Sequence, residues 1–429
     1  MKKEINSNNE KLVNKVFEIL TKFKDNPKKF ENIFIELFEK DFESQLNEIS
    51  KIKSGLLKGL IISVKDLFDV RGYHTRGGTK FLETDICSGD AKCISNIRKA
   101  GGLLLGHTNM TELAYSGLGI NPHYGTPDNP LYPGSVPGGS TSGGAVSIAL
   151  NLCDIAVGTD TGGSTRIPAA FTGITGFKPT QDSVSRDGVL KLSSSLDSVG
   201  LMAKNVELCK LGYQVMRKKV NTKQKKLENK NVKLIIPSNF GFENIDREIK
   251  TTFDFAKKKI TKSGYNIIEM NVPILNLYKK VPIWQFASVE CATEYFYLYD
   301  KKKHLIDPNV LRRIERAKEV TAVEYNLLKK IRENLIEEFN KFLKNNFLLM
   351  PTVTIKPPLL ENCKNNEFYD EANLASLRNT TLANYMNGCS ISIPYFENKK
   401  PVGIMLNATS NGDDHLLNIS SEIEKVLQK

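Results

Sequence analysis

The sequence lacks the residue spacings on which metal sites and disulfide frameworks depend. Its seven cysteines include no C-x-x-C pair, and its five histidines (His74, His107, His123, His304 and His415) form no H-x-x-x-H pair. Zinc sites use such spacings, so we expect no metal and no cofactor. An odd, unpatterned set of cysteines is typical of reduced thiols, which favours a cytoplasmic protein.

Two kinds of apolar segment are also missing. The N-terminal stretch MKKEINSNNEKLVNK starts basic but continues polar, without the apolar core of a signal peptide. No apolar run approaches the roughly 20 residues that cross a bilayer. We therefore expect no membrane partner and a cytoplasmic location.

A concentrated positive surface is absent, although the chain is basic overall. Lys and Arg outnumber Asp and Glu by 60 to 48, a formal net charge of +12. The densest basic clusters, at 217–226 and 301–303, are short and lack the interleaved aromatic residues that stack on bases. A solvated surface accounts for them, and nucleic acid is not expected as a direct partner.

Two familiar catalytic motifs are incomplete. GGSTS at 138–142 and GGSTR at 162–166 both lack the closing glycine of the G-x-S-x-G elbow. GTDTGGS at 158–164 carries Ser164 where a phosphate-binding loop has lysine. The sequence therefore favours neither an elbow-type serine hydrolase nor a nucleotide site.

The segments that are present predict an α/β fold. An apolar run at 59–64 reads as a buried strand that delivers Lys65 at its end, and a helix at 91–100 and a strand at 103–105 follow. Apolar residues at helical spacing predict helices across 11–54, including Phe30, Ile33, Phe34, Leu37 and Phe38 in the second of them.

We expect one domain over residues 1–429, with a mixed central sheet. Its parts are a helical N-terminal segment at 1–55, a core at 59–204, a variable α/β and helical lobe at 205–350, and strands with a helix at 351–429 that complete the core. The lysine-rich stretch at 217–230 is expected to be an exposed connector.

The interpretation that remains is catalysis by a serine nucleophile without a histidine partner. A serine hydroxyl needs a neighbouring base to become a nucleophile, and lysine can act as one only when it is neutral. Lowering a lysine pKa from about 10.4 by ~3 units costs ~4 kcal/mol and requires burial or nearby positive charge. Lys65, at the end of a buried strand, is the best-placed candidate.

Glycines supply a second element of such a site. In DTGGS at 160–164, consecutive residues with small side chains let backbone N–H groups converge on one point, as an oxyanion hole requires. Gly-Gly pairs are also common in ordinary turns. Two such motifs together with a strand-end lysine favour the catalytic interpretation.

These residues resemble the amidase signature family. Its hallmark, a Gly-Gly-Ser-rich stretch followed by a second serine, reads GTDTGGSTRIPAA at 158–170. The resemblance extends over 59–200, through KGLIISVKDLFDVRG, GHTNMTELAYSGLG and GFKPTQDSVSRDGV, and continues more weakly at 391–394 and 401–405. It implies a large mixed sheet covered by helices on both faces.

The resemblance also implies roles for particular residues. Ser164 would be the acylating nucleophile, Lys65 the base, and Ser140 the relay between them, preceded by a cis peptide bond. The backbone amides of Thr161, Gly162, Gly163 and Ser164 would form the oxyanion hole. The implied reaction is hydrolysis of a small-molecule amide through an acyl-enzyme, while Arg166 is expected to make structural hydrogen bonds.

Two alternatives stay open. One is the glutaminase subunit of a tRNA amidotransferase, which belongs to the same family; only in that case would nucleic acid be expected as a partner. Against it, VKDLFD at 64–69 replaces that subunit's usual Lys-Asp-Asn, PGGSTS at 137–142 has one more hydroxyl residue than its Gly-Gly-Ser-Ser-Gly, and alignment puts Leu377 where an aspartate binds the glutamine amino group. The other is a catalytically silent binding module.

The sequence does not identify the substrate or the oligomeric state. We expect specificity to come from the loops at 114–132 and from the region after residue 205, because loops on a stable scaffold carry recognition. A homodimer is left open.

Overall fold

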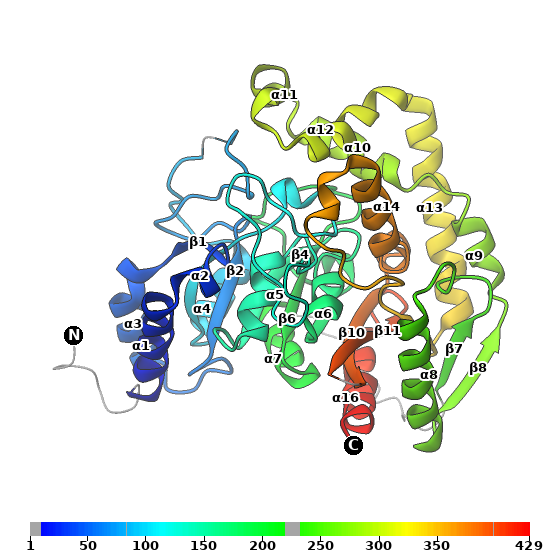
Figure 1. Cartoon of the computed structure of the whole chain (residues 1–429), viewed down its shortest axis with the longest axis horizontal. Coiled ribbons are helices and arrows are strands. Elements are labelled where there is room, and N and C mark those ends of the chain that lie inside the picture. The colour runs from blue at the N-terminus through cyan, green and yellow to red at the C-terminus, as the bar shows by residue number, and fades with distance from the viewer. Residues whose placement is uncertain (1–9, 83, 219–231, 398) are drawn as a thin grey trace.

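A single mixed sheet organises the protein, as the computed structural model shows (Figure 1). The structure describes residues 10–82, 84–218, 232–397 and 399–429. Within them, eleven strands pair in the order β1-β3-β2-β4-β6-β5-β10-β11-β9-β7-β8. Their bounds are β1 (Phe34–Leu37), β2 (Ile61–Lys65), β3 (Leu103–Thr108), β4 (Ile155–Asp160), β5 (Thr175–Lys178), β6 (Ser198–Ala203), β7 (Lys233–Pro237), β8 (Asn266–Met270), β9 (Phe347–Pro351), β10 (Cys389–Glu397) and β11 (Lys400–Ala408).

Both strand directions occur in the sheet, which confirms the predicted mixed topology. β2 runs parallel to its neighbours β3 and β4, whereas β4, β6, β5, β10, β11 and β9 form antiparallel pairs in succession. β7 is parallel to both β9 and β8. All five residues of β2 are buried, as expected for a strand flanked on both sides and covered on both faces.

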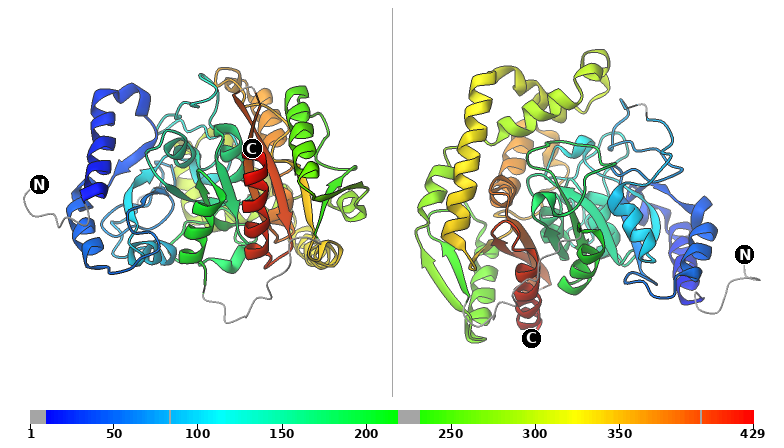
Figure 2. Two further views of the ribbon diagram at one scale, coloured as in Figure 1. Left: turned by 90° about the horizontal axis from the view of Figure 1, so that it is seen from below. Right: turned by 180° about the vertical axis from the view of Figure 1, so that it is seen from behind.

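Helices cover both faces of the sheet (Figures 1 and 2). On one face, α5 (Ser142–Ala149) and α6 (Arg166–Thr172) pack on each other and on the central strands. On the other, α4 (Lys92–Lys99), α7 (Val206–Met216), α16 (Asp413–Gln428) and α8 (Arg247–Lys262) pack side by side in that order. The predicted helix at 91–100 and the strands at 59–64 and 103–105 are therefore confirmed.

The N-terminal segment is not helical throughout, which corrects our expectation. α1 (Glu10–Asp25), α2 (Pro27–Phe30) and α3 (Phe42–Lys51) are helices, but β1 lies between α2 and α3 and pairs antiparallel with β3. The run from Ile33 to Phe38 fits a helical period as well as a short strand. The free edge of β3 decides the outcome, because pairing there satisfies its backbone hydrogen-bonding groups.

The region from 205 to 350 contributes strands to the same sheet. β7, β8 and β9 extend it at the side opposite β1 (Figure 1). Apart from α7 and α8, the helices of this region gather over one corner of the molecule: α9 (Pro273–Tyr278), α10 (Trp284–Glu294), α11 (Phe296–Lys302), α12 (Pro308–Glu315) and α13 (Ala322–Leu343) (Figure 1). Two further helices, α14 (Asn366–Leu377) and α15 (Thr381–Tyr385), follow β9 in the chain. The connector expected at 217–230 lies, from residue 219 on, outside the described residues.

Helices that could cross a bilayer must be both long and apolar. Over the part of the chain that the structure describes, none has enough of both to traverse a membrane.

Candidate active site

Lys65 ends β2 inside the protein. Its side chain is fully buried, and Nζ donates hydrogen bonds to Ser140 Oγ at 2.7 Å and to Thr159 Oγ1 at 3.0 Å. Burial lowers the pKa of Lys65 to about 7, against the charges of Asp197 and Asp160, which raise it. A lysine in this state exchanges protons near neutral pH.

Ser140 lies in the loop that leads into α5. The Gly139–Ser140 peptide bond is cis, as the sequence resemblance implies. Gly139 packs so tightly that an added Cβ would lie 2.5 Å from the backbone nitrogen of Gly119. The Ser140 side chain is fully buried and directed to the Lys65 amine. Only glycine fits at 139, so the serine is held by backbone packing.

Ser164 lies in the loop between β4 and α6, adjacent to the Ser140 loop. The backbone N–H of Thr141 donates to the Ser164 carbonyl at 3.3 Å, which joins the two loops. Ser164 also lines a cavity that opens from this point. No hydrogen bond joins the hydroxyl groups of Ser140 and Ser164 among the described contacts; such bonds often tighten only when substrate is present.

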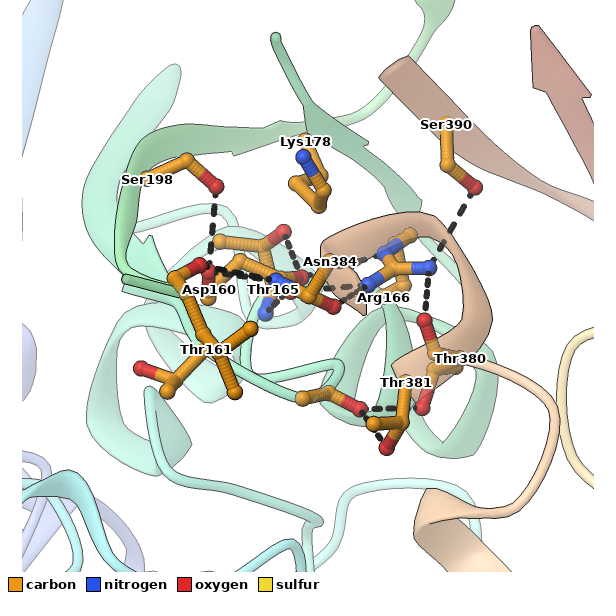
Figure 3. A network of polar contacts seen from close by, with 12 residues as sticks. Asp160, Thr161, Thr165, Arg166, Lys178, Ser198, Thr380, Thr381, Asn384 and Ser390 are labelled. Carbon is orange, nitrogen blue, oxygen red and sulfur yellow. Dashed lines mark hydrogen bonds and ion pairs between the residues drawn. The ribbon is translucent and has the colours of Figure 1, made fainter. Parts of the chain in front are cut away.

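The four residues from Thr161 to Ser164 are fixed from two directions. Thr161 Oγ1 donates to Asp197 at 2.6 Å, and the Gly162 carbonyl accepts hydrogen bonds from Thr380 and Thr381 (Figure 3). Gly163 has φ of +137°. These contacts come from segments that are distant in sequence, and they fix the backbone that could present N–H groups to an anion.

Gly163 could not be replaced by a larger residue without movement of its surroundings. A Cβ there would lie 2.2 Å from Thr380 Oγ1 and 2.6 Å from Thr380 Cβ. A positive φ is also unfavourable for residues with a side chain. The glycine-rich sequence therefore meets a local steric requirement of this loop.

Arg166 makes structural hydrogen bonds next to the loop that carries Ser164, as predicted. It is fully buried, and its guanidinium binds both carboxylate oxygens of Asp160, at 2.8 and 3.1 Å. It also donates to the Thr380 carbonyl and to Asn384, each at 2.8 Å, and to Ser390 at 3.3 Å (Figure 3). Burial alone would raise the pKa of Asp160, but Arg166 outweighs it and holds that pKa below its usual range.

A cavity of about 670 Å³ lies in front of Ser164. Thr161, Gly162 and Ser164 line it on the sheet side. The rest of the lining consists of aromatic, aliphatic and charged side chains, among them Phe240, Glu243, Tyr278, Lys279, Val281, Ile283, Trp284, Arg313, Arg316, Leu374, Leu377 and Arg378. Its volume suits a small molecule.

Sequence reasoning found only part of this wall. Of the range 114–132 expected to carry specificity, Ala114, Tyr115 and Ser116 line the cavity. Most of the other lining residues come from the region after 205, as expected. The sequence did not predict which residues of that region line the cavity. Thr159 and Asp197 were missed as well, because contacts of residues that are distant in sequence leave no local pattern.

Comparisons with known proteins agree with this fold. Residues 18–417 match the family model described as amidase. An indoleacetamide hydrolase from Pseudomonas savastanoi is 32% identical over 426 residues, covering 92% of this chain and 89% of that protein. A crystal structure of an amidase superposes with a TM-score of 0.85 and 26% identity, covering 97% of this chain and 95% of the other.

A glutamyl-tRNA(Gln) amidotransferase subunit from Chromohalobacter salexigens is also similar, with 37% identity over 257 residues. That match covers 57% of this chain and 52% of the subunit. Fold and comparisons together define a hydrolase of mixed α/β architecture that cleaves the carbon–nitrogen bonds of amides. The chain belongs to the amidase family.

Proposed function

We propose that this amidase is a free-standing hydrolase of small-molecule amides in which Ser164 is the nucleophile, Lys65 the base and Ser140 the proton relay. The 2.7 Å contact between Lys65 Nζ and Ser140 Oγ carries the proposal. With a pKa of about 7, a large fraction of Lys65 is neutral at physiological pH, whereas an ordinary lysine is almost fully protonated.

The reaction follows from this arrangement. Neutral Lys65 accepts a proton from Ser140 while Ser140 accepts one from Ser164, and Ser164 Oγ attacks the amide carbonyl. The backbone N–H groups from Thr161 to Ser164 stabilise the tetrahedral oxyanion. The proton then passes to the leaving nitrogen, the C–N bond breaks, and water releases the acid by the same relay.

The cavity wall supports a substrate with an apolar acyl group. Phe240, Tyr278 and Trp284 line the same cavity as Ser164. Contact with aromatic side chains favours flat, apolar groups over small polar ones. The similarity to indoleacetamide hydrolases supports the same class of substrate, an amide with an aromatic acyl side.

The amidotransferase subunit is the alternative to a free-standing enzyme. Leu377, which our alignment places where that subunit has an aspartate for the glutamine amino group, lines the cavity beside Gly162. An aliphatic side chain there offers no counter-charge to an ammonium group. Glutaminase activity that rises on addition of tRNA and a partner protein would favour the subunit over the free amidase.

A panel of aryl amides, aliphatic amides, urea derivatives and glutamine, scored by ammonia release, tests the proposal. We expect turnover of aryl amides by the native protein and none by Ser164→Ala. A fluorophosphonate probe should label Ser164 of the native chain, as read by mass spectrometry. Unchanged turnover in Ser164→Ala would refute the nucleophile, and a native chain that neither labels nor turns over any amide would be a silent binding module.

A further inference from the structure

The charged residues of the cavity wall are mostly of one sign. Four cations (Lys279, Arg313, Arg316 and Arg378) line it, against one carboxylate, Glu243. In a concave site, such an imbalance attracts anions and repels cations. The excess of positive charge does not show which cation binds a ligand. The existing contacts of each cation indicate which one is available.

Three of the four cations donate to protein oxygens. Lys279 Nζ donates to the Asn239 carbonyl at 2.9 Å. Arg378 donates to the Glu243 carbonyl. Arg313 donates to the Tyr115 carbonyl and lies 3.6 Å from a carboxylate oxygen of Asp370. These contacts tie the three side chains to the wall.

Arg316, in the 3-10 turn η7 (Arg316–Glu319), is held differently. Its guanidinium carbon lies 3.6 Å from the ring centroid of Trp284, which is a stacked cation–π contact. The nearest carboxylate oxygen recorded for it, on Glu319, is 4.0 Å from Nε, at the outer limit of an ion pair. Stacking fixes the plane of the guanidinium and leaves its N–H groups able to bind a carboxylate in a two-point contact.

Apolar side chains line the same cavity as this arginine. Leu374 lines the same cavity with 66% of its surface exposed, and Trp284 forms the ring wall under Arg316. An exposed apolar side chain facing a cavity is covered when an apolar ligand enters. The lining thus combines apolar surface with a positively charged group.

We propose that the substrate is an amide with an apolar, flat body and a carboxylate at the end remote from the amide, which Arg316 binds while stacked on Trp284. This inference rests on the proposed function for the position of the amide at Ser164. It adds a specificity-determining residue and an anionic group to the substrate class. Cationic amides of the same size are excluded by the same charges.

Three matched amides test the inference: phenylacetamide, its 4-carboxymethyl derivative and its 4-aminomethyl derivative. We expect native kcat/KM for the carboxylate to exceed that for the neutral amide roughly tenfold to a hundredfold, as for one charged hydrogen-bonding contact. Arg316→Gln should remove this preference through KM, raising KM for the carboxylate derivative far more than for the neutral amide. Lys318→Gln is the control, because it removes the same charge from the same turn outside the cavity and should keep the preference.

Ligand binding to an inactive variant tests the inference independently of turnover. Trp284 is the only tryptophan in the chain, so its fluorescence reports this cavity alone. In the Ser164→Ala protein, the carboxylate derivative should change the emission at lower concentration than the neutral amide, and Arg316→Gln should abolish the difference. Equal binding of the three compounds, or equal effects of Arg316→Gln on all of them, would overturn the inference. If no amide is turned over, the proposed function fails, while this binding measurement still decides the carboxylate site.

Discussion

The amine of Lys65 donates to the hydroxyl of Ser140 at 2.7 Å, and both side chains are fully shielded from solvent. Because burial lowers the pKa of Lys65 to about 7, protonation of this amine should control the rate. We expect kcat/KM to rise with pH through about 7 and to level off above it, since only the neutral amine accepts a proton. Rates of ammonia release from pH 5 to 9 would measure this, and a profile flat down to pH 5 would contradict it.

Asp197 offers a second test of the same amine. Its charge raises the pKa of Lys65. Asp197→Asn should therefore shift the acidic limb of the profile to lower pH, even if the lost contact to Thr161 lowers the plateau. A purely structural role for Asp197 would lower the plateau without moving the limb.

Lys65→Met should inactivate the enzyme without making it less stable near neutral pH. The native lysine has a folded pKa near 7 and an unfolded pKa near 10.4, so the unfolded chain binds more protons between these values. Above about pH 10.4 the lysine is neutral in both states and does not lower the free energy of unfolding. As pH falls from 10.4 toward 7, that free energy falls by roughly 1.4 kcal/mol per pH unit. The variant lacks this slope, so its advantage over the native protein should shrink from pH 7 to 9.5 in urea unfolding.

Gly163→Ala should reduce kcat/KM far more than Gly162→Ala. The first substitution puts a Cβ within 2.6 Å of Thr380 Cβ at a φ of +137°, whereas the nearest atoms to a Cβ at 162 lie at 3.1 and 3.2 Å, in the flexible side chains of Leu377 and Thr381. We expect a loss of at least about a hundredfold for Gly163→Ala, comparable to loss of an oxyanion donor. Similar kinetics for the two variants would argue against a strict requirement at 163.

Arg166→Met should destabilise the fold by about 3–5 kcal/mol, because it leaves the Asp160 carboxylate buried without its charge partner. Arg71→Met is the control: its pair with Glu48 is 3.7 Å long and mostly exposed, so the expected cost is below about 1 kcal/mol. Denaturant midpoints of the two variants compare these costs. Equal midpoints would mean that the buried pair contributes little.

The sequence predicted the parts of the fold in which local pattern and environment agree. The apolar run before Lys65 is a buried central strand, and its short, continuous, β-branched composition located it. β1 was missed because its four residues fit both the helical and the strand period. Pairing with the edge of β3 favours the strand. β5 was missed because its four residues lie among Gly173, Gly176 and Pro179, and β6 because it follows a serine-rich stretch and contains Gly200.

The residues of the candidate site also differ in how far the sequence predicted them. Lys65, Ser140 and the loop from 161 to 164 stand in recognisable local motifs, so sequence resemblance located them. Asp197 and Thr380 act on that loop only after the chain has folded back on itself, and nothing in their neighbouring residues indicates it.

The dependence of Arg166 on Thr380, Asn384 and Ser390 has a consequence for biosynthesis. The loop bearing Ser164 leaves the ribosome more than two hundred residues before the segment that braces it. We expect a nascent chain that stops short of residue 380 to hold Lys65, Ser140 and Ser164 without these contacts and therefore to be inactive. Because β10 and β11 lie inside the sheet, a proteolytic cut that separated them from the core should likewise inactivate the protein.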